Sequence, residues 1–244
     1  MNLEDYPDGI KEDIEDQSLE ILGSISEDII VIGGWAVRAL LQSRHARYTL
    51  DVDGITKTRK IVAVGKKLEA LGLKGRRAEW GVQYFRKYTP GVGILGPAKT
   101  IPNDIELRIE ISGQRIKEKH THHFFEFDLD EYEKGSIPYH SGKGSVQVKI
   151  PPARVMAAVK LGLPADYKNN FDAAALLRIA DIDEVIRTIK SNDDWRDVVI
   201  RRIPKLIGRI SMSDDLAHIL AVNAGIDIRG YARKLKEIEK QLSL

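Results

Sequence analysis

The sequence predicts an α/β fold, with a mixed-sheet domain over residues 1–150 followed by a helical domain over residues 151–244. Two observations carry this prediction. Up to about residue 150, short stretches of alternating apolar residues are interspersed with stretches of helical spacing. After Pro151 and Pro152 the helical spacing continues and the strand signals end. A length of 244 residues allows one large domain or two modest ones.

The composition excludes several classes of protein and of site. With 43% hydrophobic and 30% charged residues the chain is globular. Its formal net charge of +2 does not mark a nucleic-acid binder, so any basic site must come from local clustering. The absence of cysteine excludes disulfides, thiolate zinc sites and a cysteine nucleophile. No apolar run approaches the roughly 18 residues of a membrane span, so we expect a cytoplasmic protein without membrane contact.

The first predicted elements alternate between helix and strand. Residues 9–27 have the apolar spacing of a helix, and residues 29–32 form a short apolar run that ends at two glycines, as a strand before a turn does. A helix begins directly after that turn. Residues 48–55 alternate and predict a strand, and residues 61–71 predict an amphipathic helix. Further strands are predicted over residues 81–85, 104–112, 122–129 and 146–150.

The second half is predicted to be helical. Its apolar residues recur at intervals of three and four, and strand signals are absent from the stretches concerned. All sheet-forming segments are therefore expected before residue 151. The predicted helices span residues 152–163, 170–179, 181–190, 214–226 and 231–242.

Two aspartates share one face of the predicted strand 48–55. Asp51 and Asp53 are two residues apart, so their side chains point to the same side of the strand. Like charges this close raise each other's pKa or require a cation. Carboxylate oxygens suit Mg²⁺ or Mn²⁺, which bind through one or two carboxylates, waters and substrate phosphates. The pair therefore predicts a metal site.

A third carboxylate is available on the predicted strand 104–112. Its apolar residues alternate with Glu106, Arg108 and Glu110, so the two glutamates share the polar face. Either glutamate can complete a site with the aspartates. Glu106 is also explained as an exposed strand residue paired with a basic neighbour, and that structural interpretation is favoured for it.

The turn at Gly33 and Gly34 predicts a phosphate site. The first N–H groups of a helix have no partner within the helix, and the helix dipole favours an anion there. Glycine allows a phosphate to approach the backbone closely. Arg47 leads into the strand of the two aspartates, and Thr49 lies on their face, so both are candidate ligands of a triphosphate. Together these features predict metal-assisted phosphoryl or nucleotidyl transfer.

The order of these motifs resembles the polymerase β-like nucleotidyltransferase superfamily. Gly33 and Gly34 match its hG[GS] motif, Asp51 and Asp53 match D-h-[DE], and Glu110 matches h-[DE]-h better than Glu106 does. Within the superfamily the chain is most similar to AbiEii-type nucleotidyltransferase-like proteins, many of which are toxins of toxin–antitoxin pairs. The resemblance covers roughly residues 28–178 and implies Asp51, Asp53 and Glu110 as catalytic metal ligands.

A later block also resembles that family. The stretch VMAAVKLGLPADYKNNFDAAALL is similar to its lysine helix followed by R/K-D-x-x-D, which places Lys160, Lys168 and Asp172 on matching positions. The resemblance implies that Lys160 neutralises triphosphate charge, that Lys168 contacts the NTP and that Asp172 positions Lys160 or the acceptor. Asn169 stands where the family has its first acidic residue, which puts any general-base role of that residue in doubt.

The predicted function is a Mg²⁺-dependent nucleotidyltransferase that moves an NMP from an NTP to an acceptor hydroxyl. The acceptor is an RNA, a protein or a small molecule, and a toxin role would require a partner antitoxin. Two alternatives stay open. One is a catalytically inactive nucleotide-binding or regulatory module, favoured by Asn169 and the modest net charge. The other is a metal-dependent phosphohydrolase.

Aromatic and histidine residues near these motifs have structural interpretations as well. Trp35 could stack on a base, but an aromatic residue after a turn more often anchors the core, and that is our prediction. His120, His122 and His123 could bind a metal, but too few further ligands accompany them. We therefore expect these histidines to lie on a solvated hairpin edge.

Overall fold

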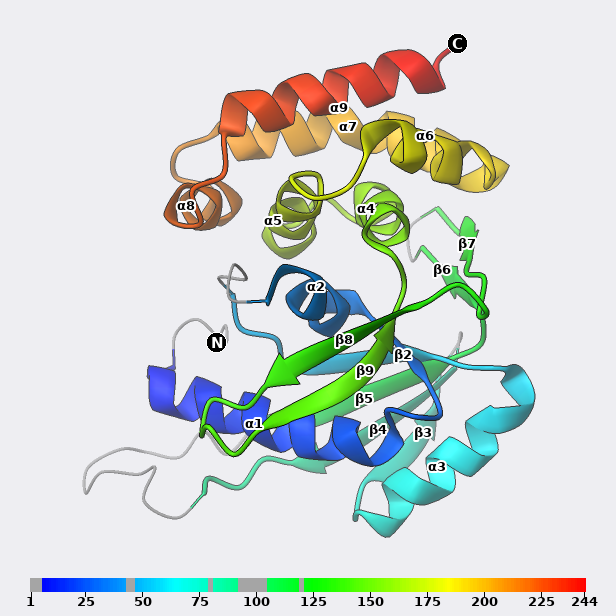
Figure 1. Ribbon diagram of the computed structural model, residues 1–244, viewed down its shortest axis with the longest axis vertical. Helices are drawn as coiled ribbons and strands as arrows, with labels where there is room; N and C mark the ends of the chain where they lie inside the picture. Colours follow the sequence, from blue (N-terminus) through cyan, green and yellow to red (C-terminus); the bar gives the residue numbers. More distant parts are fainter. Residues whose placement is uncertain (1–5, 43–46, 79–80, 92–104, 119–120) are drawn as a thin grey trace. The chain divides into compact units, whose positions relative to one another are not determined.

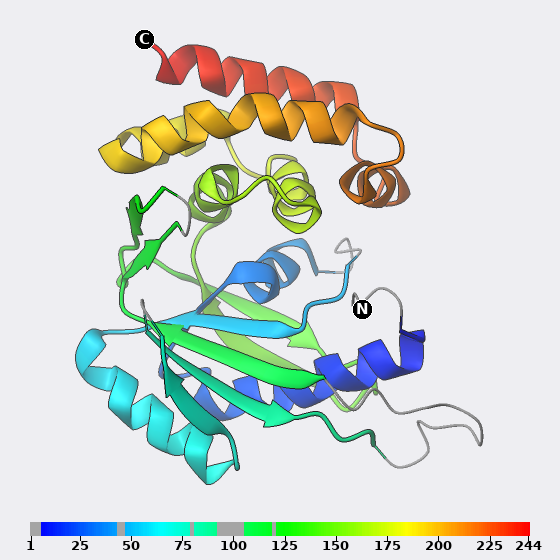
Figure 2. The same cartoon turned by 180° about the vertical axis from the view of Figure 1, so that it is seen from behind.

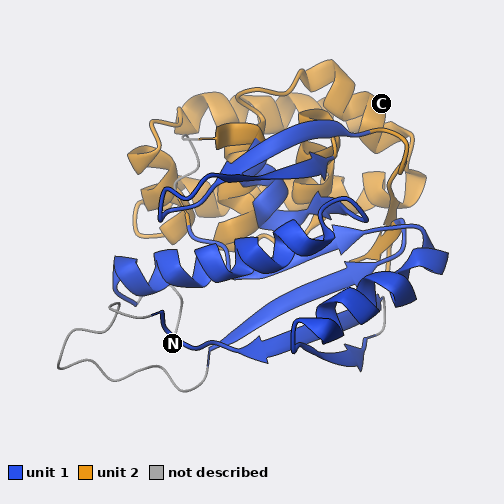
Figure 3. Cartoon of the chain, turned by 60° about the horizontal axis from the view of Figure 1, so that its bottom comes forward, with its two compact units in different colours: residues 1–39, 48–114, 132–150 blue, residues 40–47, 115–131, 151–244 orange. Residues whose placement is uncertain are grey.

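The computed structural model describes residues 6–42, 47–78, 81–91, 105–118 and 121–244 (Figure 1). The chain divides into two compact units (Figure 3). Unit 1 comprises Met1–Ala39, Tyr48–Gln114 and Tyr132–Ile150, and unit 2 comprises Leu40–Arg47, Arg115–Glu131 and Pro151–Leu244. One unit boundary therefore follows residue 150, where the predicted domain boundary lies. Residues 40–47 and 115–131 belong to unit 2, although they precede that boundary.

Unit 1 is built on a mixed sheet with the strand order β1-β2-β5-β4-β3. Strands β2 and β5 are parallel, and the other neighbours are antiparallel. The mixed sheet and the accompanying helices confirm the predicted α/β class. The strands are β1 (Ile30–Ile32), β2 (Asp51–Ile55), β3 (Lys74–Arg77), β4 (Gly81–Lys87) and β5 (Glu106–Ser112). Strand β3 was not predicted, because its four residues are all exposed and do not alternate.

One face of this sheet is apolar and is covered by two helices. Val52, Ile109 and Tyr84 pair in register on β2, β5 and β4, and all three are buried. Helices α1 (Asp8–Ile25) and α3 (Ile61–Ala70) contact each other and the sheet. In Figure 2 the strands lie in front of α1. Because side chains alternate along a strand, the residues between the buried ones point to the opposite face.

The remaining elements of unit 1 are helix α2, a two-stranded ribbon and a short 3-10 helix. Helix α2 (Gly33–Leu41) begins directly after β1, and the unit boundary passes through its last turn. Trp35 on α2 has no exposed surface, which confirms the predicted core anchor. Strands β8 (Glu133–Pro138) and β9 (Ser145–Ile150) form an antiparallel ribbon, and β9 contacts α1 and β1. A short 3-10 helix, η3 (Thr58–Lys60), precedes α3.

Unit 2 is mainly helical, with a ribbon of β6 (Arg115–Lys117) and β7 (Phe124–Glu126). Trp195 joins the ribbon to the helices. Its indole Nε1 donates to the carbonyl of Ala158 at 2.9 Å, and Phe125 packs edge-on at a centroid distance of 5.6 Å. The helices are α4 (Ala153–Gly162), α5 (Tyr167–Leu176), α6 (Ile182–Lys190), α7 (Asp193–Ser211), α8 (Leu216–Asn223) and α9 (Ile228–Leu242). In the described ranges, every helix is too short or too polar to span a bilayer.

Helix α7 is the main element that was not predicted. It contains Pro204 and a high density of charged residues, which obscure its apolar spacing. Proline cannot donate the usual backbone hydrogen bond inside a helix. Pro204 lies on the exposed side of α7, whereas Val199, Ile203 and Leu206 are buried at helical spacing. Burial of that stripe therefore outweighs the missing hydrogen bond.

Candidate active site

A row of partly polar side chains crosses the sheet of unit 1 on the face opposite α1 and α3. Ile32, Asp53, Glu110, Gln83 and Arg76 are successive register partners across β1, β2, β5, β4 and β3. Side chains that pair across neighbouring strands point to the same face. Asp53 and Glu110 are therefore direct neighbours, although 57 positions separate them along the chain.

The register also distinguishes the two candidate glutamates. Asp51 precedes Asp53 by two residues on the same face and pairs with Arg108. The pairing of β5 with β2 begins at Arg108, so Glu106 has no register partner on β2. It pairs with Lys87 on β4 and is exposed. It is also four residues from Glu110, roughly 13 Å along a strand. The arrangement therefore supports Glu110 rather than Glu106 as the partner of the two aspartates.

Gly33 brings the start of α2 against Asp53. Its φ of +67° is a left-handed conformation that favours glycine. A Cβ at this position would lie 2.2 Å from Asp53 Oδ2, well inside van der Waals contact. The sequence analysis interprets glycine here as a residue that lets a phosphate approach the backbone, and the structure gives a second reason for it, the close approach of Asp53. Gly34 is the next residue of α2, in the turn whose N–H groups have no helical partner.

Gln83 was missed by the sequence analysis and holds Glu110 in place. Its Nε2 donates a hydrogen bond to Glu110 Oε2 at 2.9 Å, and its Oε1 accepts one from Arg76 Nη2 at 2.8 Å. This chain of hydrogen bonds orients the Glu110 carboxylate along the sheet. The alternation of GVQYF places Gln83 on the polar face, but only the pairing of β4 with β5 connects it to Glu110.

The carboxylates of this face are the kind of donors that Mg²⁺ prefers. Asp51, Asp53 and Glu110 are half-buried and share one side of the sheet. Among the described residues, however, no group of three or more histidine, aspartate or glutamate side chains is arranged to hold a metal ion. Mg²⁺ commonly uses one or two carboxylates and completes its shell with waters and substrate phosphates. The carboxylates of Asp51 and Asp53 fit such a site, and the roles of Asp51, Asp53 and Glu110 as metal ligands stay predictions.

A second predicted set of residues forms a buried ionic cluster in unit 2. The carboxylate of Asp172 has no exposed surface and accepts hydrogen bonds from Arg47 Nε at 2.8 Å and Arg47 Nη2 at 2.6 Å. Lys160 Nζ lies 2.9 Å from Asp172 Oδ2. Burial alone would lower the pKa of Arg47, but the charge and hydrogen bonds of Asp172 outweigh burial and raise it. The contact that we expect between Asp172 and Lys160 is present in this cluster.

Asn169 completes the surroundings of Lys160. Its Oδ1 accepts a hydrogen bond from Lys160 Nζ at 3.1 Å, and its Nδ2 donates to the carbonyl of Pro164 and to Asp166 Oδ2. An amide here keeps the hydrogen bond to the lysine and removes a negative charge. Lys160 is nearly fully buried, so it does not snorkel to solvent. The roles of Lys160, Asp172, Arg47 and Lys168 toward an NTP stay predictions.

A buried glutamate holds the segment that leads into β2. Glu15 on α1 has no exposed surface, and it accepts a hydrogen bond from the N–H of Thr49 at 2.6 Å. Its other oxygen contacts Arg38 of α2 and lies 2.6 Å from His140 Nε2. Thr49 itself is buried, and its contact with a phosphate stays a prediction. The contacts of Glu15 position the residues just before Asp51. The periodicity of the sequence does not reveal these contacts.

The fold of this chain is similar to that of a solved nucleotidyltransferase. No model of a protein family matches the sequence, and no curated protein matches it. Among solved structures, the chain is similar to MenT4, a nucleotidyltransferase toxin from Mycobacterium tuberculosis. The match has 14% identity and a TM-score of 0.57, and it covers 96% of this chain and 82% of MenT4. This likeness confirms the predicted fold.

Two further solved structures match less closely in space. JHP933 from Helicobacter pylori matches with 14% identity and a TM-score of 0.47, covering 94% of each chain. The antibiotic-resistance factor ANT(2'')-Ia matches with 14% identity and a TM-score of 0.48, covering 72% of this chain and 90% of that protein.

Proposed function

We propose that this protein is a Mg²⁺-dependent nucleotidyltransferase that moves an NMP from an NTP to an acceptor hydroxyl. The observation that carries the proposal is the position of Asp53. It lies against Gly33 at the start of α2, and its strand neighbour is Glu110. A helix start favours phosphate and carboxylates favour a cation, so this position joins the two halves of an NTP–Mg²⁺ site. The fold shared with MenT4 supports the same chemistry.

The proposed reaction forms one bond and breaks one. The acceptor oxygen bonds to the α-phosphorus of the NTP, and the bond from that phosphorus to the bridging oxygen breaks. Pyrophosphate leaves with the electron pair, and the acceptor proton passes to solvent. Asp51 and Asp53 would hold the cation, Gln83 fixes the Glu110 side chain, and the N–H groups of α2 would bind phosphate oxygens. When bound, the cation lowers the pKa of the acceptor hydroxyl and neutralises charge on the phosphates.

A transfer assay tests the proposal. The purified protein is incubated with Mg²⁺ and with each common NTP labelled at the α-phosphate, in the presence of total RNA or total protein. We expect labelled acceptor with the wild type, and a loss of about 100-fold or more in Asp51→Asn and Asp53→Asn. Glu110→Gln should also lose activity, whereas Glu106→Gln on the same strand should retain it. Equal activity of the aspartate variants and the wild type would overturn the proposal.

A catalytically inactive nucleotide-binding module is the second candidate. One observation favours it: Lys160 contacts Asn169, an uncharged residue at the position where the family that the sequence resembles has an acidic one. Calorimetry with NTP and Mg²⁺ distinguishes the candidates. Binding that depends on Mg²⁺, without labelled acceptor under any of the conditions above, would identify the module.

A toxin role is a further part of the proposal. MenT4 is a nucleotidyltransferase toxin, and its fold is shared over 96% of this chain. We expect induced expression of the wild type to arrest bacterial growth, and Asp53→Asn to abolish the arrest at equal protein level. An antitoxin encoded next to this protein should restore growth when it is co-expressed. Arrest by Asp53→Asn would separate toxicity from the proposed chemistry.

A further inference from the structure

A second row of side chains crosses the polar face of the unit 1 sheet beside the row of Asp53 and Glu110. Its members are successive register partners across β2, β5, β4 and β3, namely Asp51, Arg108, Phe85 and Lys74. Each member is two residues from the first-row residue on its own strand, so the two rows share one face. The acidic site therefore continues, on β5 and β4, into a cation and an aromatic ring.

Arg108 is the central cation of this second row, and it is half-buried. Its register partner on β2 is Asp51, which has the opposite charge. Across the described ranges of the chain, however, neither of these two side chains makes a hydrogen bond or an ion pair. All five N–H donors of the Arg108 guanidinium are therefore available to a ligand. A partly buried charge without a partner is costly, so a ligand with acceptor atoms would stabilise it.

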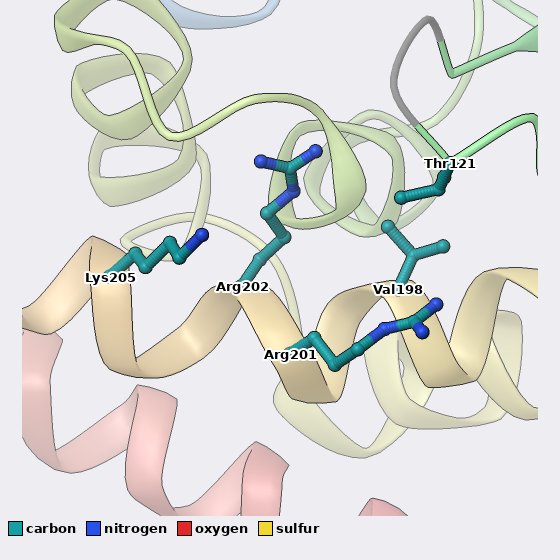
Figure 4. Close-up of a pocket in the computed structure, with 5 residues that line it drawn as sticks. All are labelled: Thr121, Val198, Arg201, Arg202 and Lys205. Carbon is teal, nitrogen blue, oxygen red and sulfur yellow. The ribbon is translucent and has the colours of Figure 1, made fainter.

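The arginines of helix α7, by contrast, have partners. A hollow of about 340 Å³ beside this helix is lined by Thr121, Val198, Arg201, Arg202 and Lys205 (Figure 4). Arg202 Nη2 donates to Glu118 Oε1 at 3.0 Å, and Arg201 Nη2 lies 2.9 Å from His123 Nε2. His123 therefore contacts α7 instead of lying on a purely solvated edge as predicted, whereas His120 is outside the described residues. These two arginines hold the turn between β6 and β7 on α7.

Phe85 supplies the aromatic part of the second row. Its ring is half-buried on a face of the sheet whose other side chains are mostly polar or charged. The guanidinium carbon of Arg76 lies 5.8 Å from the ring centroid, within the range of a cation–π contact. Arg108 is the register partner of Phe85 on β5. An aromatic ring beside a free guanidinium offers a nucleobase both a stacking surface and hydrogen-bond donors.

We propose that Phe85 stacks on the nucleobase of a bound NTP and that Arg108 donates two hydrogen bonds to the edge of that base. The inference rests on the proposed function. The start of α2 lies on the β1 side of the carboxylates, against Asp53, whereas Arg108 and Phe85 lie on β5 and β4. An NTP with its triphosphate at α2 and its α-phosphate at the carboxylates has its nucleoside over β5 and β4.

The chemistry of Arg108 selects among the four bases. A guanidinium has donors and no acceptor, so its planar two-bond contact requires two neighbouring acceptors on the base. Guanine offers O6 beside N7, and cytosine offers O2 beside N3. In adenine the neighbour of N7 is an amino donor, and in uracil an N–H donor separates the two carbonyl oxygens. We therefore expect Arg108 to favour GTP or CTP over ATP and UTP.

Calorimetry with Mg²⁺ and each of the four NTPs, without an acceptor, tests the inference by binding alone. The wild type should bind the tighter of GTP and CTP at least about 5-fold more tightly than ATP and UTP, and Arg108→Met should lose this preference. Arg108→Lys keeps the charge without the fork of donors, so it should lose the preference as well. Phe85→Leu should weaken the binding of every NTP at least about 5-fold without changing their order.

Matched controls separate the nucleoside from the phosphates and from general effects of substitution. Inorganic tripolyphosphate with Mg²⁺ has no base, so its affinity should be equal in the wild type, Arg108→Met and Phe85→Leu. Phe124→Leu on β7 removes another half-buried ring, which lies 4.7 Å from the guanidinium carbon of Arg115. Arg77→Met removes an exposed cation from the opposite face of β3. Both of these variants should bind all four NTPs as the wild type does.

Three outcomes would overturn the inference. Equal affinities for all four NTPs, or a preference for ATP or UTP, would exclude the contact of Arg108 with the base. Weaker binding of tripolyphosphate by Arg108→Met would assign this arginine to the phosphates. Unchanged NTP binding with slower transfer would assign it to the acceptor. If Arg108→Met is unfolded by circular dichroism, Arg108→Lys provides the same test.

The same measurements distinguish this inference from the proposed function. Preferential binding of GTP or CTP that depends on Arg108, without NMP transfer, would refute the proposed function and leave the nucleoside site supported. NMP transfer by the wild type, with an unchanged NTP preference in both Arg108 variants, would refute the nucleoside site and leave the function supported. Absence of binding by every NTP would refute both.

Discussion

Exchange of Gly33 for alanine tests the arrangement on which the proposed site depends. Gly33 has a φ of +67°, and an added Cβ would lie 2.2 Å from Asp53 Oδ2. The left-handed backbone costs an alanine about 1–2 kcal/mol. Relief of the short contact adds about 1–3 kcal/mol, as overpacking generally does. We therefore expect Gly33→Ala to lower the free energy of unfolding by about 2–5 kcal/mol and to displace the Asp53 carboxylate.

Gly72 offers a matched control in the same unit. Its φ is +80°, but no atom lies within 4 Å of its Cβ position, so Gly72→Ala has the backbone cost alone, about 1–2 kcal/mol. Urea unfolding followed by circular dichroism measures both variants, and the labelled-NTP assay measures transfer. A displacement of about 1 Å at a reacting group can cost about 100-fold in rate, so transfer should fall in Gly33→Ala and persist in Gly72→Ala. Equal losses of stability and of activity in the two variants would refute the reasoning.

Three further predictions concern single side chains. Gln83→Met should lower the rate of transfer about 10- to 100-fold, because Glu110 loses the amide that orients it. Asp172→Asn should lower the free energy of unfolding by about 3–5 kcal/mol, because two buried cations lose their counter-charge. Burial and the hydrogen bond to Asp13 raise the pKa of Tyr88 above 10.0, so this tyrosine contributes stability that is present below pH 10 and is lost as the pH rises further. Tyr88→Phe should therefore make the alkaline decline in urea stability shallower.

Each of these predictions has a control at an exposed position. Gln147→Met on β9 should leave the transfer rate unchanged, and a comparable fall there would contradict the role given to Gln83. Asp183→Asn on α6 should change the free energy of unfolding by at most about 0.5 kcal/mol. If Asp172→Asn is as stable as that control, the buried cluster has another source of compensation. Tyr132→Phe should leave the alkaline decline as steep as in the wild type, and the same result for Tyr88→Phe would exclude its contribution.

The candidate active site and helix α7 are detected by different signals. The motif spacing of Gly33, Asp51 and Asp53 is compact, so it is visible in 21 consecutive residues. Helix α7 was not predicted, because Pro204 and its many charged residues obscure its apolar spacing. Arg202 on α7 donates a hydrogen bond to Glu118, which lies 84 positions away along the chain. Surface charge by itself would have indicated only a solvated helix face.

The sequence by itself determined the local parts of this protein. Alternation put Asp51 and Asp53 on one face of a strand, and helical spacing after the double glycine predicted α2 with Trp35 in the core. These features depend on residues within a few positions of each other, and the backbone periods of 2.0 and 3.6 residues fix which way their side chains point.

Only the tertiary structure decided which distant residues meet. The parallel register of β2 with β5 put Glu110 beside Asp53 and left Glu106 beyond the end of β2, and the pairing of β4 with β5 added Gln83. The packing of unit 2 places Arg47 against the buried carboxylate of Asp172, and the two residues form an ion pair there. Strand register and ion pairing across many residues depend on how whole elements pack, and a one-residue slip would give every side chain of a strand a different neighbour.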